Sequence, residues 1–289
     1  MKIDVSSYKV DDGETLSLGK RSTDVAPLYT SKAHYQEILG AHQHKLSRLQ
    51  EDLYRSTSYA LLLVLQGMDT AGKDGAISHV MSGVDPQGCK VAAFKQPTAS
   101  ENEHDFLWRC ARELPPRGVI GIFNRSYYEP VLVTRVHPEL LRDEGVSEKE
   151  ADLETLWAER LRSIRDFERH LHVNRTRFAK IFLHISKEEQ LKRLMSRLDT
   201  PDKTWKASPA DARERKYWKQ YRKAYEHTLT ESSVGAAPWW VVPADDKLNA
   251  RLIVSQIVID ALEALDLAPP AIDAARRREL KEIRKSLEK

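Results

Sequence analysis

A predicted strand from Tyr59 to Gln66, apolar as far as Leu65, leads directly into the glycine-rich segment Gly67-Met68-Asp69-Thr70-Ala71-Gly72-Lys73-Asp74-Gly75. Such a run, without polar alternation, is typical of a strand buried on both faces of a parallel sheet. The segment after it has the spacing G-x-x-x-x-G-K, and a stretch of helical character continues to Gly83. Strand, loop and helix in this order predict a phosphate-binding loop.

The composition of this loop suits the binding of an anion. Its glycines let successive backbone N–H groups face one phosphate, the helix N-terminus adds partial positive charge, and Lys73 adds a full charge. A glycine-rich turn without a ligand is the alternative. Asp69 is a candidate metal ligand or orients a phosphate acceptor, and its alternative role is to cap loop amides. The candidate phosphate-binding residues are Gly67, Thr70, Ala71, Gly72, Lys73, Asp74 and Gly75.

Further apolar runs and amphipathic stretches alternate along the rest of the chain. The additional predicted strands are 91–94, 119–123, 179–185 and 239–242. The predicted helices are 31–54, 74–83, 101–114, 148–172, 187–198, 209–231 and 248–267. Because strands alternating with helices indicate right-handed βαβ units, we expect an α/β fold with a parallel sheet between two helical layers.

Composition narrows the class of protein. The 289 residues are 41% hydrophobic and 31% charged, with a formal net charge of +3, which argues against a disordered chain and against a general nucleic-acid coat. Cys89 and Cys110 show no metal or disulfide spacing, and neither a signal peptide nor a membrane span is evident. We expect a cytoplasmic protein with no nucleic-acid or membrane partner. It would have an N-terminal arm (1–30), one domain (31–270) and a charged C-terminal helix or tail (271–289).

Two positions depart from the usual phosphate-loop pattern. The residue after the loop lysine is usually Ser or Thr, whose hydroxyl binds magnesium, and a second buried strand usually ends in aspartate. Here Asp74 follows the lysine and Asn124 ends the strand. Because an amide cannot neutralise magnesium, we expect the charge to come from Asp69 and from Glu129, the closest carboxylate in sequence.

Basic residues mark two further regions. Arg125 lies at the carboxyl end of the predicted strand 119–123, where open α/β sheets bind ligands, and Arg135 is a weaker candidate. Surface arginines are the alternative for both. Between residues 187 and 223, twelve basic residues face six acidic ones, a local excess of +6. The centre of this region, from Arg197 to Lys206, joins two predicted helices and contains proline, as in a mobile lid. A solvated pair of charged helices is the alternative.

Together these motifs resemble the polyphosphate kinase 2 family, which transfers phosphoryl groups between inorganic polyphosphate and nucleotides. The resemblance runs from about Tyr35 to Leu265. The matching segments are 67–75, 122–129, 167–171, 182–186, 202–206 and 237–242. With Asn124 and Glu129, the second of these segments resembles the class III subgroup, which is associated with phosphorylating both nucleoside mono- and diphosphates.

The resemblance implies a three-layer α/β/α sandwich of the P-loop kinase type, with a helical lid at about 197–216. It also implies Mg²⁺-dependent transfer, with Mn²⁺ as an alternative metal. Asp69, Lys73, Arg125 and Arg197 match the family's acidic loop residue, loop lysine, strand-end arginine and lid arginine. Asn124 stands where other members carry Asp, which leaves the metal ligand set incomplete.

On this basis the sequence predicts transfer from polyphosphate to AMP or ADP. The loop amides and Lys73 would hold the transferring phosphoryl group, while Arg125 and Arg197 stabilise its charge and Asp69 and Glu129 hold the metal. Candidate polyphosphate-binding lysines in the lid are Lys203, Lys206 and Lys216. Candidate nucleotide-binding residues are Lys95, Trp108, Arg109, Asn124 and Arg135.

Two other functions fit parts of the pattern. An ATP-dependent nucleotide or small-molecule kinase would use the same loop with ATP as the donor. A non-catalytic polyanion-binding protein would use the loop and the basic lid without turnover, although the placed acidic residues favour an enzyme. A homo-oligomer is also expected, with the predicted helices 148–172 and 248–267 as candidate interface elements, although packing in the core explains their apolar stripes equally well.

Overall fold

The computed structural model of the chain describes residues 1–147, 152–267 and 274–288. Six strands within these residues form one sheet in the order β1-β6-β5-β2-β4-β3. The strands are β1 (Lys9–Val10), β2 (Ala60–Gly67), β3 (Cys89–Ala93), β4 (Ile120–Asn124), β5 (Thr176–His184) and β6 (Trp239–Pro243). Strand β2 lies at the centre and pairs in parallel with β4 and β5, so the carboxyl ends of all three meet where the glycine-rich loop begins.

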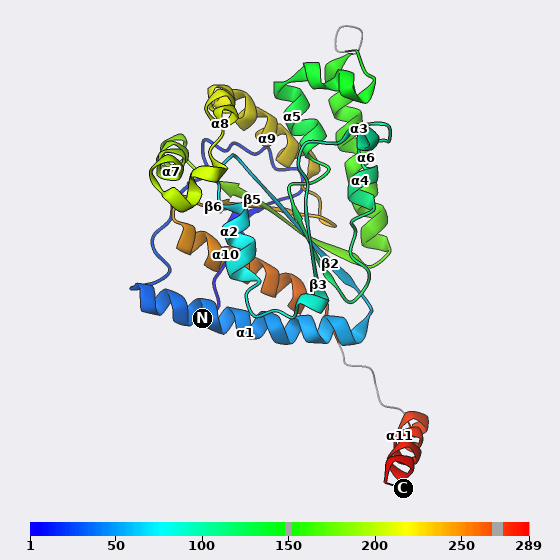
Figure 1. Cartoon of the computed structure of the whole chain (residues 1–289). Helices are drawn as coiled ribbons and strands as arrows, with labels where there is room; N and C mark the ends of the chain where they lie inside the picture. Colours follow the sequence, from blue (N-terminus) through cyan, green and yellow to red (C-terminus); the bar gives the residue numbers. More distant parts are fainter. Residues whose placement is uncertain (148–151, 268–273, 289) are drawn as a thin grey trace.

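Helices cover both faces of this sheet (Figure 1). Helices α1, α2 and α10 pack on one face, and α5, α6 and α9 pack on the other. The helices are α1 (Lys32–Ser56), α2 (Lys73–Val80), α3 (Ala99–Asn102), α4 (Trp108–Ala111), α5 (Glu129–Val136), α6 (Leu153–Val173), α7 (Lys187–Asp199), α8 (Pro209–Glu214), α9 (Trp218–Ser232), α10 (Lys247–Glu263) and α11 (Ala274–Leu287). The 3₁₀ turns are η1 (Ser6–Tyr8), η2 (Pro86–Gly88), η3 (Pro138–Glu144), η4 (Pro201–Lys206) and η5 (Arg215–Tyr217). The predicted three-layer α/β/α architecture is confirmed.

The first helix illustrates how local sequence sets these elements. The side chain of Ser31 accepts a hydrogen bond from the backbone N–H of His34 and so caps α1. Buried residues then recur three or four positions apart, from Tyr35 through Ile38 to Leu53. Thr57 ends the helix in the left-handed conformation, with a φ of 46°. The apolar stripe packs α1 against α10, which itself lies on β5 and β6.

Two predicted helices are corrected by the structure, and two elements of the structure were not predicted. The single helix expected over 101–114 is two short helices, α3 and α4, because Asp105 accepts the backbone N–H of Leu107 and starts a new turn. The helix expected over 209–231 is divided into α8, η5 and α9, and Arg215 at the break donates to the backbone oxygen of Lys187. Strand β1, antiparallel to β6, and helix α5 were not predicted.

The two ends of the chain differ in burial. The N-terminal arm lies on the domain and contributes Ile3, Val10, Leu16 and Leu18 to the core. The side chains of α11 are exposed, and this helix follows residues that lie outside the described set. The first residues of the helix expected over 148–172 also lie outside it. Among the helices that are described, none is both long enough and apolar enough to span a lipid bilayer.

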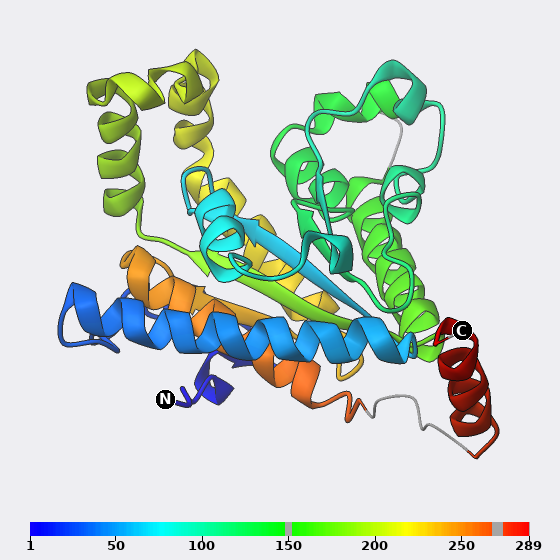
Figure 2. The same cartoon turned by 60° about the horizontal axis from the view of Figure 1, so that its bottom comes forward.

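The basic segment predicted as a lid lies beside the carboxyl end of the sheet. Figure 2 shows α7, η4 and α8 rising above the body of the molecule, and α9 returning from them to the face of the sheet. The loop between β2 and α2 lies at the foot of this projection. The fold therefore places basic residues of α7 and aromatic residues of α9 next to the glycine-rich loop.

Candidate active site

The backbone of the glycine-rich loop requires small residues at two positions. A Cβ atom on Gly67 would lie 2.9 Å from both the Cβ of Ala71 and the backbone oxygen of Leu183. Gly72 has a φ of 104°, in the left-handed region that favours glycine. Thr70 adopts a positive φ of 65° although it is not glycine, a conformation that costs of order 1 kcal/mol or more. The loop is a strained turn held in place by its surroundings.

Lys73 begins α2 and points back over the loop. Its Nζ atom donates a hydrogen bond to the backbone oxygen of Gly67 at 2.7 Å, which closes the turn across its base. Burial, with the nearby Arg125 guanidinium, lowers the pKa of Lys73 to about 8, while Asp69 acts in the opposite direction. At neutral pH the side chain therefore carries a positive charge that is poorly hydrated and available to an anion.

Arg193, which was not among the predicted site residues, holds the glycine-rich loop through hydrogen bonds to its backbone. Arg193 on α7 is buried and donates to the backbone oxygens of Thr70 at 3.0 Å and Ala71 at 2.9 Å. Its Nε atom donates to Glu189 at 2.8 Å. Gln190, on the same helix, donates to the backbone oxygen of Asp69 at 3.3 Å. The i,i+4 spacing of Glu189 and Arg193 was visible in the sequence, but it did not distinguish this arginine from the other cations of α7.

Arg125 lies between two carboxylates. Its Nη1 atom is 3.2 Å from Glu129 Oε2, and its Nη2 atom is 3.4 Å from Asp69 Oδ1. Both carboxylates raise the pKa of the guanidinium, Glu129 more than Asp69. The backbone φ is 65°, and the Arg125 N–H donates to the oxygen of Leu65, which fixes this residue against β2. The structure thus brings together three of the predicted site residues, Asp69, Arg125 and Glu129.

The two unusual positions, Asp74 and Asn124, contact each other. The Nδ2 atom of Asn124 donates to Oδ1 of Asp74 at 2.7 Å. In the usual pattern a hydroxyl on the loop faces an aspartate at the strand end. Here the loop carries the carboxylate, on Asp74, and the strand end carries an amide, on Asn124. The two departures are therefore one change, in which the carboxylate lies on the loop instead of at the strand end. This contact was not predicted, and Glu129 had been expected to supply the missing charge.

A first cleft of about 670 Å³ opens over the loop. Its described lining residues include seven basic and only two acidic side chains. The basic ones are Lys73, Lys95, Arg125, Arg193, Arg197, Lys247 and Arg251, and the acidic ones are Asp69 and Asp74. Arg197 also pairs with Asp211 of α8 at 3.3 Å. Lys247 and Arg251, on α10, had not been predicted. This cleft is strongly cationic and suits a chain of phosphates.

A second cleft, of about 460 Å³, adjoins the first. Asp69 and Arg125 line both. The walls of the second cleft carry apolar and aromatic groups, namely Leu132, Val133, Leu140, Trp218, Tyr221 and Tyr225. Its described acidic residues outnumber its arginines: Asp69, Glu129, Glu139, Asp211 and Glu214 against Arg125 and Arg215. The two clefts therefore differ in charge and meet at the ion pairs of Arg125.

The polar groups of the second cleft are ordered by hydrogen bonds that join Glu214, on α8, to α9 and to the residue that follows α5. The hydroxyl of Tyr221 donates to Glu214 Oε2 at 2.8 Å, and His137 Nε2 lies 2.9 Å from the same oxygen. Burial raises the pKa values of Tyr221 and Tyr225, so both hydroxyls stay protonated near neutral pH. The second cleft therefore presents neutral hydroxyls beside carboxylates.

Several predicted residues lie away from both clefts. Arg109 is buried, donates to the backbone oxygen of Lys95 at 2.8 Å, and lines a separate hollow together with Trp108. Arg135 lies over the ring of Trp157. Lys216 is exposed and lines neither cleft. The side chains of Lys203 and Lys206 lie outside the described set.

Comparisons with known proteins identify the family of the chain. The family model described as polyphosphate kinase 2 (PPK2) matches residues 29–269. An ADP-polyphosphate phosphotransferase from Rhodopseudomonas palustris is 53% identical over 287 residues, covering 99% of both chains. An AMP/ADP-polyphosphate phosphotransferase from Meiothermus ruber is 41% identical over 242 residues, covering 84% of this chain and 86% of the relative.

A solved structure extends the agreement to the fold. The crystal structure of polyphosphate kinase 2 from Arthrobacter aurescens TC1 superimposes with a TM-score of 0.84 at 42% identity, covering 95% of both chains. The resemblance inferred from the phosphate loop, the strand-end segment and the lid is thus confirmed over most of the chain. The chain belongs to the polyphosphate kinase 2 family.

Proposed function

We propose that this protein transfers a phosphoryl group from inorganic polyphosphate to ADP, and to AMP in a second reaction. The observation that carries the proposal is the pair of adjoining clefts of opposite charge that share Asp69 and Arg125. A relative named for ADP and another named for AMP and ADP support these acceptors.

The cationic first cleft is the site proposed for polyphosphate. A linear polyanion is bound by a row of Lys and Arg side chains, and its affinity depends strongly on salt. The loop amides and Lys73 would hold the terminal phosphate, and Arg251 on α10 would contact phosphates further along. Arg197 is placed by α7 at the same cleft, so we propose that the α7–η4–α8 segment acts as a lid over the polymer.

The second cleft is the site proposed for the nucleotide. Its aromatic and aliphatic walls suit a base and sugar, whereas its excess of carboxylates disfavours a long polyanion. A nucleotide phosphate extending toward Arg125 would reach the junction with the first cleft. This assignment differs from the sequence-based expectation, because none of the five predicted nucleotide-binding residues lines the second cleft. Lys95 and Asn124 line the first cleft, and Trp108 and Arg109 line the separate hollow.

The arrangement serves in-line phosphoryl transfer. An oxygen of the acceptor's terminal phosphate attacks the end phosphorus of the polymer, and the bond to the bridging oxygen of the next phosphate breaks, so the polymer leaves one unit shorter. Lys73 and the loop amides stabilise the transferring group, and Arg125 bridges it to the acceptor. This chemistry needs positioning and neutralisation of charge rather than a covalent intermediate.

The residues present fit a magnesium ion shared with the substrates. Mg²⁺ is commonly held by one or two carboxylates together with substrate phosphates and water. No group of three His, Cys, Asp or Glu side chains suited to a metal occurs among the described residues. Asp69 and Asp74 both line the first cleft, while Glu129 lines the second. We propose Asp69 and Asp74 as the protein ligands, and a bound Mg²⁺ would neutralise charge on the phosphates.

One assay tests the proposed function. The purified full chain is incubated with Mg²⁺, polyphosphate and either ADP or AMP, and the product nucleotides are separated and quantified. We expect ATP from ADP, and ADP from AMP, only when polyphosphate is present. Transfer from ATP to AMP or to a small molecule, without any polyphosphate-dependent product, would favour the ATP-dependent kinase. Tight polyphosphate binding without any product would favour the non-catalytic polyanion-binding protein.

The variant Asn124→Asp tests whether Asp74, on the loop, replaces the carboxylate that usually ends the strand. In this variant two carboxylates face each other across the present hydrogen bond, so one is protonated or they repel. We expect kcat/KM to fall about tenfold in Asn124→Asp and in Asp74→Ser, and to recover largely in the double variant, which restores one carboxylate and one donor. Mn²⁺ affinity, followed by electron paramagnetic resonance, is expected to show the same recovery. Losses that simply multiply in the double variant would contradict this replacement.

The pKa of Lys73 predicts a pH dependence. The free enzyme needs protonated Lys73, so kcat/KM is expected to fall as pH rises through about 8. Bound phosphates favour the charged lysine, so the corresponding limb of kcat should lie at higher pH. Lys73→Arg should move the limb of kcat/KM upward, because a guanidinium does not deprotonate in this range. An unchanged limb in that variant would assign the titration to another group.

Arg251→Gln tests the polymer-binding side of the first cleft. We expect the slope of log KM for long-chain polyphosphate against log salt concentration to decrease by about one in magnitude. The KM for ADP should stay the same. Lys219→Gln on α9 is the matched control, since Lys219 is exposed and lines neither cleft. An equal change of slope in both variants would indicate a general effect of net charge.

A further inference from the structure

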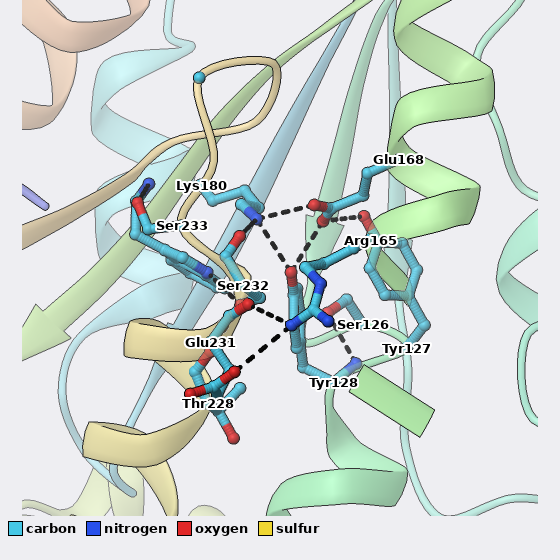
Figure 3. A network of polar contacts seen from close by, with 12 residues as sticks. Ser126, Tyr127, Tyr128, Arg165, Glu168, Lys180, Thr228, Glu231, Ser232 and Ser233 are labelled. Atoms are coloured by element: carbon cyan, nitrogen blue, oxygen red, sulfur yellow. Dashed lines mark hydrogen bonds and ion pairs between the residues drawn. The ribbon is translucent and has the colours of Figure 1, made fainter. Parts of the chain in front are cut away.

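Residues 125–128 join β4 to α5 and are called here the Arg125 loop. A buried ion pair contacts this loop on the face of the sheet that carries α6 and α9 (Figure 3). The Nζ atom of Lys180, on β5, is 2.7 Å from Oε2 of Glu168, on α6, and both side chains are 0% exposed. The same Nζ also donates to the hydroxyl of Tyr128 at 2.9 Å and to the backbone oxygen of Ser232 at 2.7 Å. All three ammonium N–H groups are therefore used, in three different directions.

The carboxylate of this pair holds the two tyrosines of the loop. The hydroxyls of Tyr127 and Tyr128 donate to the same oxygen of Glu168, at 2.9 and 2.8 Å. Both tyrosines are fully buried and lie in sequence between Arg125 and Glu129. The two tyrosine hydroxyls therefore anchor to Glu168 the segment that carries Arg125 and Glu129.

A second set of contacts holds the loop from the side of β2. Gln66 donates to the hydroxyl oxygen of Ser126 at 3.2 Å, and the Arg125 N–H donates to the oxygen of Leu65 at 3.1 Å. Arg125 keeps its left-handed backbone conformation between these two anchors. Such a conformation persists only where the surroundings over-determine it. On the side of the loop that faces away from the cleft, these surroundings are the hydrogen bonds of Tyr127 and Tyr128 to Glu168 and Lys180.

The network also reaches the nucleotide side of the proposed site. Ser232 is the last residue of α9, and its backbone oxygen accepts from Lys180. Tyr221 and Tyr225, on the same helix, line the second cleft. One ammonium group therefore ties the end of this helix to the Arg125 loop.

A contribution to folding stability does not by itself explain why the ion pair of Glu168 and Lys180 is buried. Removing two charges from water costs several kcal/mol per ion, and apolar replacements of buried pairs are often neutral or stabilising. Burial accordingly raises the pKa of Glu168 and lowers that of Lys180. What the pair provides that apolar residues cannot is a set of fixed hydrogen-bond directions toward Tyr127, Tyr128 and the end of α9.

We infer that Glu168 and Lys180 are positioning residues for phosphoryl transfer, which hold Arg125 and Glu129 in place through Tyr127 and Tyr128. The inference rests on the proposed function for its kinetic consequences. Its structural content, that the network orders the loop, can be measured without turnover.

Tyr128→Phe is the most selective variant, because it removes the bridging hydroxyl and keeps the ring. We expect kcat to fall roughly ten- to a hundredfold, the loss typical of a displacement of about 1 Å, with KM for ADP and polyphosphate nearly unchanged. In an Arg125→Ala background the same change should have almost no further effect on kcat. Multiplicative losses would show that the hydroxyl does not act through Arg125.

Hydrogen exchange followed by mass spectrometry gives a readout that does not depend on activity. Tyr128→Phe should speed exchange in peptides covering 124–131 and the end of α9, and leave the peptides of α1 unchanged. Tyr127→Phe, which spares every bond of Lys180, should produce a smaller effect at 124–131 alone. Unchanged exchange at 124–131 in Tyr128→Phe would overturn the inference even if the enzyme proved inactive with polyphosphate.

Ser255→Ala is the matched control on the opposite face of the sheet. Ser255 is buried and its hydroxyl lies 2.7 Å from His42 Nδ1, so the variant also loses a buried hydrogen bond. We expect a comparable fall in melting temperature but normal kcat. A loss of kcat in Ser255→Ala equal to that in Tyr128→Phe would reduce the network to a general contribution to stability.

Absence of polyphosphate turnover in the unmodified enzyme would instead contradict the proposed function. Hydrogen exchange alone would then decide whether the network orders the loop.

Discussion

Lys73→Met is expected to lower kcat by a factor on the order of 10² to 10³ or more, the usual loss when one preorganised charge or donor at a transition state is removed. Methionine keeps the length and packing of the side chain but removes the ammonium group. That group is the one full positive charge that the loop segment 67–75 itself contributes to the first cleft. The measurement is the rate of ATP formation from ADP with saturating polyphosphate.

Stability separates this loss from unfolding. Burial lowers the pKa of Lys73 to about 8, so the lysine is still charged at neutral pH, but holding this charge costs more free energy in the folded state than in the unfolded chain. The unfolded chain keeps its proton up to about 10.5, so the contribution of Lys73 to the free energy of unfolding increases as pH rises between these values. Lys73→Met should therefore keep its melting temperature at pH 7. Turnover close to that of the unmodified enzyme would remove Lys73 from the mechanism.

Arg125→Ala is expected to lower kcat by a similar factor, on the order of 10² to 10³. Arg125 lines both clefts and lies within 3.4 Å of Asp69 and 3.2 Å of Glu129. Without the guanidinium these carboxylates face the incoming phosphates directly, so transition-state stabilisation is lost and repulsion is added. We expect the KM for ADP to rise as well, which distinguishes this variant from Lys73→Met.

Arg125→Lys is the informative partner. It keeps the charge but loses the planar fork that reaches two carboxylates at once. We expect activity between those of the alanine variant and the unmodified enzyme. If lysine restored full activity, charge alone would suffice, and the two-sided geometry of Arg125 would be unnecessary for transfer.

The strands were predictable because each leaves a local signal. Four of the five predicted strands are largely buried and read as nearly continuous apolar runs, and the edge strand β3 still shows a short apolar run. All five appear in the structure within three residues of their predicted positions. Strand β1 has two residues and leaves no such run. The break in the helix expected over 209–231 depends on Arg215 reaching Lys187 and Gln190 of α7, a tertiary contact without a sequence signature.

The site divides in the same way. The loop, Asp69, Lys73 and Arg125 carry motif spacing and were predicted from the sequence, and in the structure they line the first cleft. Arg251 comes from α10, more than a hundred residues from β4, and only the packing of α10 against α2 brings it to the loop. The contact between Asp74 and Asn124 likewise spans 50 positions. Pairings of this kind depend on the order of strands in the sheet rather than on local composition.

The position of Arg125 at the junction of the two clefts has a thermodynamic consequence. Because Arg125 lines both clefts, a guanidinium that orients toward a polymer end in the first cleft also alters the electric field in the second. If polyphosphate and the nucleotide bind as proposed, each substrate is an effector of the other, and linkage requires that each change the affinity of its partner by the same factor. In the proposed enzyme, cooperativity between donor and acceptor would arise within a single chain, from one shared side chain.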